Sequence, residues 1–67
     1  MQYEETRRYV CASDSGKQYI IIEQMRRSSR SSEQPKRDYI TEKGEIVSRL
    51  DEANFLLLLE GEIVHVA

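Results

Sequence analysis

Tryptophan is absent from this 67-residue chain, and cysteine, histidine, proline and phenylalanine each occur once. Cys11 therefore cannot form an internal disulfide, whereas small secreted domains usually depend on several. The first five residues are polar or acidic apart from Met1 and contain no apolar run of the kind that a signal peptide requires. The longest apolar run, 55–59, is much shorter than the roughly 20 residues of a membrane-spanning helix. We expect a soluble, cytoplasmic protein with no membrane partner.

The chain also has few of the side chains on which catalysis and metal binding depend. One His and one Cys cannot complete a four-ligand zinc site, and the three isolated glycines form no phosphate-binding loop. A nucleophile–base pair of Cys11 and His65 would require the first and last strands to be neighbours, and a Cys in a Tyr-Val-Cys-Ala strand is more often a small buried apolar residue. We therefore expect no enzyme, no catalytic or metal-binding residue and no cofactor.

Length and composition favour one small folded domain. The sequence is 39% hydrophobic and 33% charged, which is typical of a folded chain rather than a disordered one. A domain of this size buries only about 60% of the surface that its unfolded chain exposes, so its stability is marginal or shared with a partner. The net charge of −2 argues against a protein whose whole surface binds nucleic acid.

Charge is distributed unevenly along the chain. Residues 26–37 contain five basic side chains and one acidic side chain, whereas residues 38–67 contain two basic and seven acidic ones. The basic stretch also contains four serines and the single proline but no aliphatic or aromatic residue, which is typical of a solvated loop. We predict a flexible basic loop at 26–37 within a single domain that spans residues 1–67.

The first strand-rich segment has the pattern of a β-hairpin. An alternating stretch, 8–13, is followed by Asp14-Ser15-Gly16, in which Gly accepts a positive φ. A second strand is predicted over 17–25, with three consecutive isoleucines, 20–22, at its centre. Three β-branched residues in a row indicate apolar neighbours on both faces, as in a closed barrel or a dimer.

The second segment predicts two further hairpins. Residues 39–41 and 45–47 flank a turn at Gly44, and residues 54–59 and 62–67 flank the two-residue turn Glu60-Gly61. Between the hairpins lies a polar bend, which allows one short helical turn near 51–54 with Asp51 as its cap. Leucine favours helix, so the run 55–59 has a helical alternative, but the nearby turn and β-branched residues favour strand.

Five or six short strands separated by turns predict an all-β, mainly antiparallel domain, with an SH3-like or partly open barrel as the architecture. The expected core is Val10, Ala12, Tyr19, Ile21, Ile40, Val47, Phe55, Leu57, Val64 and Val66.

The turn glycines and core positions of both segments form a pattern. It reads Tyr39-x-Thr41-x-x-Gly44-x-x-Val47, followed by Phe55 and Gly61-Glu62, with an aromatic residue and Gly16-x-x-Tyr19 in the preceding hairpin. This pattern resembles that of small uncharacterised bacterial β-domain proteins. The resemblance implies a compact β-fold and assigns no activity, catalytic residue or binding residue.

The basic stretch is a candidate binding site for an acidic partner. Its cationic side chains are Arg26, Arg27, Arg30, Lys36 and Arg37. They could also follow a phosphate backbone, with Tyr19 and Tyr39 as stacking surfaces. An acidic protein is the partner that we expect, because the acidic remainder of the chain repels a long polyanion. Nucleic-acid binding as an accessory protein is the alternative, and an exposed loop that merely offsets the acidic half is a third interpretation.

The leucine run is the candidate self-association site. Large apolar groups on both faces of one strand leave one face, Leu56 and Leu58, uncovered by a small barrel. Pairing of two such strands about a two-fold axis predicts a homodimer; contact between the basic loop of one chain and the acidic half of another could add to it. The alternative is that the bend 50–53 or the loop covers these leucines. The expected function is thus a non-enzymatic, homodimeric interaction protein that uses an apolar strand and a basic loop.

Overall fold

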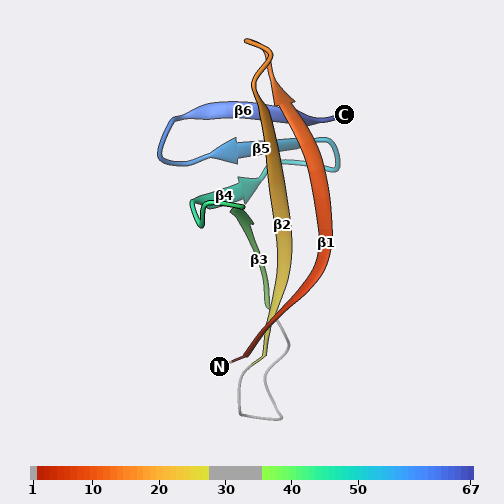
Figure 1. Cartoon of the computed structure of the whole chain (residues 1–67). Coiled ribbons are helices and arrows are strands. Elements are labelled where there is room, and N and C mark those ends of the chain that lie inside the picture. Colours follow the sequence, from red (N-terminus) through yellow and green to blue (C-terminus); the bar gives the residue numbers. More distant parts are fainter. Residues whose placement is uncertain (1, 28–35) are drawn as a thin grey trace.

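A computed structural model describes residues 2–27 and 36–67, which form six antiparallel strands closed into a small barrel (Figure 1). The strands are β1 (Gln2–Ser13), β2 (Gln18–Arg27), β3 (Lys36–Thr41), β4 (Ile46–Arg49), β5 (Asn54–Leu57) and β6 (Glu62–Val66). Each strand pairs with the next, and β6 pairs with β1 to close the barrel. The all-β prediction is confirmed, and the barrel is closed rather than partly open.

The β1–β2 hairpin is the longest element of the fold. The backbone N–H of Ser13 donates to the carbonyl of Lys17 over 2.8 Å, and Gly16 occupies the turn with a φ of +89°. A left-handed φ is easy for glycine because it has no Cβ. The turn predicted at 14–16 is therefore confirmed, and both strands extend further from it than the sequence pattern indicates.

The leucine run forms a strand only in its first half. β5 ends at Leu57, and the segment 58–61 is a turn in which the N–H of Gly61 donates to the carbonyl of Leu57 over 2.8 Å. The prediction of a two-residue turn at Glu60-Gly61 was wrong, because Leu57 pairs directly with Glu62 and four residues connect them. Leu58 and Leu59 consequently belong to the turn.

The bend before β5 contains no helical turn. The Asp51 carboxylate accepts hydrogen bonds from the Ala53 N–H at 2.8 Å and from the Asn54 side-chain amide at 2.9 Å. These bonds stabilise a local aspartate turn, which offers the backbone an alternative to helix. The N–H of Leu50 also donates to the Asn54 carbonyl, so the chain enters β5 directly. The possible helical turn near 51–54 is thus absent.

The core lies inside the barrel and is built from alternate residues of its strands. Its buried members are Cys11, Ile21, Val47, Phe55, Leu57 and Val64, with Tyr9, Tyr19, Tyr39 and Val66 packed against them. Three residues expected in the core point outward instead, namely Val10, Ala12 and Ile40. On β1 the inward side chain is Cys11, between Val10 and Ala12, and on β3 it is Tyr39, next to Ile40. The prediction was off by one residue on these strands, and in a strand one residue separates the inner face from the outer face.

Three strands continue beyond the barrel as an arm, formed by residues 2–6 of β1, 24–27 of β2 and 36–38 of β3 (Figure 1). The predicted loop 26–37 was wrong at both ends, because Arg26 pairs with Lys36 and Met25 pairs with Arg37. These cross-strand pairs keep the ends of the basic stretch in the sheet. Of the predicted binding residues, Arg30 lies outside the described residues.

Candidate interaction surface

An apolar surface covers the outside of the barrel where β4, the β5–β6 turn and β6 meet. We define it as Ile46, Leu56, Leu58, Leu59 and Ile63. Leu56 pairs across the strands with Ile63, and the N–H of Leu58 reaches the Ile46 carbonyl at 3.4 Å, so these four are neighbours in two pairs, and Leu59 follows Leu58 in the turn. The exposed fractions are 64% for Ile46, 51% for Leu58 and 79% for Leu59. Large apolar side chains exposed together, rather than singly, are typical of a binding surface.

The structure brings the two predicted self-association residues together and adds three more. Leu56 is half-buried on the outer face of β5, and the bend 51–53 leaves Leu58 half exposed. Ile46 and Ile63 were missed, although each directly precedes a buried valine and strand alternation therefore directs it outward. β5 is hydrogen-bonded to β4 on one side and to β6 on the other, so this surface can bind only through side-chain packing.

The predicted basic residues lie on different faces of the arm. Arg26 and Lys36 are a cross-strand pair and share one face, whereas Arg37 belongs to the alternate face with Tyr39. Lys36 and Arg37 are exposed, and Arg26 is half-buried. Arg27 ends β2, and the position of its side chain is outside what the structure describes. The basic residues therefore form a distributed positive region instead of one site.

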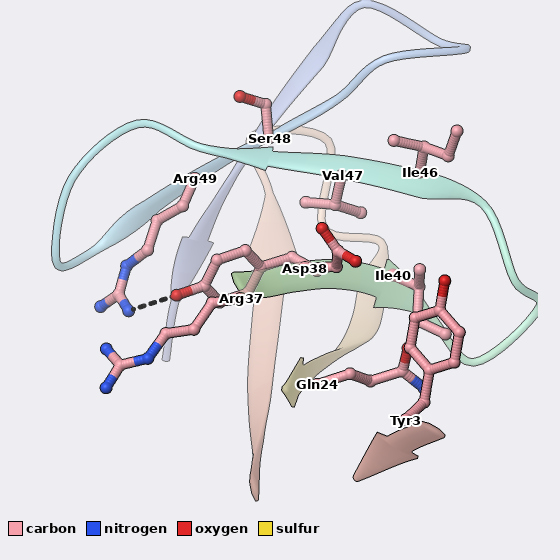
Figure 2. A pocket seen from close by; sticks show the side chains of 10 residues that line it. Tyr3, Gln24, Arg37, Asp38, Ile40, Ile46, Val47, Ser48 and Arg49 are labelled. Atoms are coloured by element: carbon pink, nitrogen blue, oxygen red, sulfur yellow. Dashed lines mark hydrogen bonds between the residues drawn. The ribbon is translucent and has the colours of Figure 1, made fainter. Parts of the chain in front are cut away.

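A groove of about 610 Å³ opens where β3 and β4 separate, because these strands pair only at Tyr39–Val47 and Ile40–Ile46. Figure 2 shows Ile40 and Ile46 at one end of this groove and Arg37 and Arg49 at the other. Its walls thus combine apolar side chains with cations.

Arg49 closes the end of the barrel that faces the arm. Its guanidinium lies 5.3 Å from the ring centre of Tyr9, 5.7 Å from that of Tyr39 and 5.4 Å from that of Phe55. It donates hydrogen bonds to both tyrosine hydroxyls, and to the carbonyls of Asp51 and Glu52 at 3.0 and 3.2 Å. Cation–π contacts and hydrogen bonds both favour a fixed guanidinium here. Arg49 therefore connects four segments of the chain.

Glu23 is a buried carboxylate beside Arg49. It accepts hydrogen bonds from the Thr6 hydroxyl at 2.6 Å and the Tyr39 hydroxyl at 3.0 Å, and its Oε2 lies 3.8 Å from Arg49 Nη1. The hydrogen bond from Thr6 is the main cause that lowers the pKa of Glu23; the bond from Tyr39 and the charges of Arg37 and Arg49 add to it, while burial opposes it. The carboxylate is therefore held in its charged form as part of a satisfied polar network.

The structure separates Cys11 from His65. Their strands are neighbours, since Ala12 pairs with His65, but Cys11 faces the core and is fully buried while His65 is exposed on the outer face. Burial raises the pKa of the Cys11 thiol, which disfavours the reactive thiolate. His65 contacts the side-chain amide oxygen Oδ1 of Asn54 through Nδ1, and Asp14 Oδ1 at 3.3 Å through Nε2. The two side chains cannot act as a nucleophile and base.

No protein-family model, curated protein or solved structure matches this chain. The resemblance to small bacterial β-domain proteins stays a prediction. Across residues 2–27 and 36–67, His, Cys, Asp and Glu side chains nowhere gather in a group of three that could hold a metal ion. Those residues also form no helix long and apolar enough to cross a membrane.

Proposed function

We propose that this chain is a non-enzymatic interaction protein of the cytoplasm that forms a homodimer through its apolar surface and binds an acidic protein through its basic residues. The observation that supports dimer formation is the contiguous exposure of Ile46, Leu58, Leu59 and Ile63 around Leu56. Their burial against another chain removes apolar area from water, which is the main favourable contribution to most protein association.

A second copy of the chain is the occupant that we favour for this surface. A domain of 67 residues gains little stability from its own core, and an apolar interface with an identical chain supplements it. A two-fold axis through the surface would place the leucines of one copy on those of the other, as an isologous contact requires. Glu45 and Glu60 flank the surface in sequence and repel their counterparts, so the contact should tighten when salt screens them.

Solution mass measured by light scattering tests the dimer. In about 1 M NaCl, where charge contacts are screened to about 3 Å, the wild-type chain should be a dimer and Leu56→Glu/Leu58→Glu should be a folded monomer. Leu50→Glu is the matched control, because Leu50 is similarly exposed at 49% but lies outside the apolar surface. A wild-type monomer in high salt contradicts the proposal, as does a double variant that stays dimeric.

The binding of an acidic partner is supported by three cations that the sheet holds along the arm, Arg26, Lys36 and Arg37. Asp38 is the one acidic residue of β3. Fluorescently labelled polyglutamate is a suitable probe. It should bind the wild-type chain in low salt and lose most of its affinity for Lys36→Glu/Arg37→Glu, whereas Lys17→Glu/Lys43→Glu, at the other end of the barrel, should bind as the wild type does. Equal binding by both double variants would overturn the assignment.

Nucleic-acid binding is the second candidate function, supported by the same cations and by the exposed Tyr3 on the arm. The two functions differ in their dependence on polymer and salt. A nucleic-acid-binding protein should prefer a single-stranded oligonucleotide to polyglutamate of equal charge, because bases stack on aromatic side chains, and its affinity should fall steeply with salt.

A further inference from the structure

The pairing between β3 and β4 stops where two arginines would face each other. The last pair before the gap is Tyr39–Val47, and the same register would next place Arg37 opposite Arg49. Like charges on directly opposite residues destabilise strand pairing. In the part of the chain that the structure describes, no strand pairs with either arginine on this side, and the groove of about 610 Å³ opens there.

The backbone polar groups of both arginines point into this groove. In an antiparallel sheet, successive residues of a strand direct their N–H and C=O groups to alternate sides. The Thr41 N–H donates to the Glu45 carbonyl, just before β4, at 2.9 Å, so Arg37, an even number of residues earlier, points the same way. The Ile46 carbonyl accepts a hydrogen bond on the β5 side, so Arg49, an odd number of residues later, faces β3. Such a strand edge can pair with a further strand.

The two faces of β3 beside the groove differ in chemistry. Arg37 shares the face of Tyr39, and Figure 2 shows it at the same end of the groove as Arg49. Asp38 and Ile40 alternate with these residues and lie on the other face. Arg49 already donates to tyrosine hydroxyls and backbone carbonyls. Arg37 is exposed, so it is the cation of the groove that can bind a carboxylate from another molecule.

We propose that an extended acidic segment of a partner protein enters this groove and pairs with β3 at Arg37 as an added antiparallel strand. It takes the place that β4 leaves and continues the ladder that β4 begins. The backbone of Arg37 supplies hydrogen bonds, and a carboxylate beside its guanidinium removes the like-charge repulsion with Arg49. This inference rests on the acidic partner in the proposed function and specifies where and how that partner binds.

The side chains along β3 select the order of residues in the segment. Directly opposite residues of an antiparallel pair share a face, so the residue opposite Arg37 should be acidic. The residue before it lies opposite Asp38 and toward Ile40 and Ile46, which favour an apolar side chain and repel a carboxylate. The residue after it lies opposite Lys36 and should be acidic. The preferred order from the amino end is therefore apolar, acidic, acidic.

Two labelled peptides of equal composition test this order by fluorescence anisotropy in low salt. One has Val-Glu-Glu between threonines, and the other has Glu-Glu-Val. The first should bind the wild-type chain several-fold more tightly. Arg37→Glu should lose that preference and bind a Val-Lys-Glu peptide instead, whereas Lys17→Glu, at the other end of the barrel, should behave as the wild type does. Equal affinity for the two peptides overturns the proposal, while polyglutamate binding that depends on Lys36 and Arg37 would leave the proposed function standing.

Amide hydrogen exchange measured by NMR provides a second readout, which reports on the backbone. With the Val-Glu-Glu peptide bound, the Arg37 N–H should exchange several-fold more slowly, because it donates to the added strand. The Asp38 N–H is the control, since it points toward β2 and should be unchanged. A bound peptide that leaves the Arg37 amide unprotected overturns strand addition. Protection by a single-stranded oligonucleotide but by neither peptide would assign the groove to nucleic acid and overturn the proposal as well. Circular dichroism confirms that every variant is folded.

Discussion

At the scale of single residues, Arg49 holds several strands together at the end of the barrel that faces the arm. Arg49→Ala removes a guanidinium that packs over three rings and donates to two tyrosines and two carbonyls. We expect the free energy of unfolding in urea to fall by about 2 kcal/mol. Arg49→Lys should restore only a small part, since an ammonium lacks the planar fork. Arg7→Ala is the control, because Arg7 is exposed and its guanidinium lies 5.8 Å from the centre of one ring, that of Tyr9; an equal effect would contradict this role for Arg49.

Glu23 gives the stability of the fold a defined dependence on pH. Its pKa lies below the ordinary value of 4.5 in the folded state, so its contribution is fully present above pH 4.5 and is lost as the pH falls through the folded pKa. Glu23→Gln should be less stable than the wild type near pH 7, and the difference should shrink in acid. Urea unfolding at several pH values between 7 and 3 measures this. A difference that stays constant would contradict the assignment.

The Cys11 thiol should react slowly with thiol reagents in the folded protein. Its side chain is fully buried, and burial raises the pKa of the thiol, so thiolate is scarce at neutral pH. A thiol-specific reagent such as dithionitrobenzoate should therefore react with the native chain far more slowly than with the chain in denaturant. Rapid labelling under native conditions would show that the strand is open or the thiol activated.

At the scale of elements, the turn between β3 and β4 depends on one glycine. Gly44 has a φ of +88°, and its N–H donates to the Thr41 carbonyl over 2.9 Å. No atom would touch an added Cβ, so the penalty for Gly44→Ala comes from the backbone alone and should be roughly 1–2 kcal/mol. Gly44→Asn should cost less, because asparagine tolerates this conformation. Thermal unfolding of the three proteins provides the test, and equal stability of all three would contradict it.

The strands were predictable wherever turn chemistry and alternation agree. Glycine at 16 and 44, between β-branched or aromatic runs, places two hairpins correctly. The run 55–59 was harder, because five apolar residues in succession have no period that distinguishes strand from turn. Pairing with Glu62 ends β5 at Leu57. Most of the arm was missed for a related reason: residues 2–6, 26–27 and 36–38 are polar or charged apart from Tyr3, so they show no apolar alternation that would indicate a strand.

At the scale of the whole molecule, closure of the barrel depends on the last strand. Val64 is fully buried, the Val66 N–H donates to the Ala53 carbonyl, and β6 joins β5 to β1. Removal of residues 64–67 should therefore abolish the cooperative unfolding transition. The core loses the side chain of Val64, and most of the pairing of β6 with β1 and β5 is lost with it. A Gly-Ser extension after Ala67, which is exposed, should leave the transition unchanged. Circular dichroism during heating distinguishes them, and a cooperative truncated chain would contradict this dependence.

The sequence by itself determined the all-β class, the main turns and the inward side chains of β4, β5 and β6, because these follow from local backbone preferences and two-residue alternation. Only the tertiary structure decided which leucines join Ile46 and Ile63, and that Cys11 and His65 face opposite ways. Those features depend on register and closure, which arise when strands distant in sequence pair and fix every side chain on one face or the other.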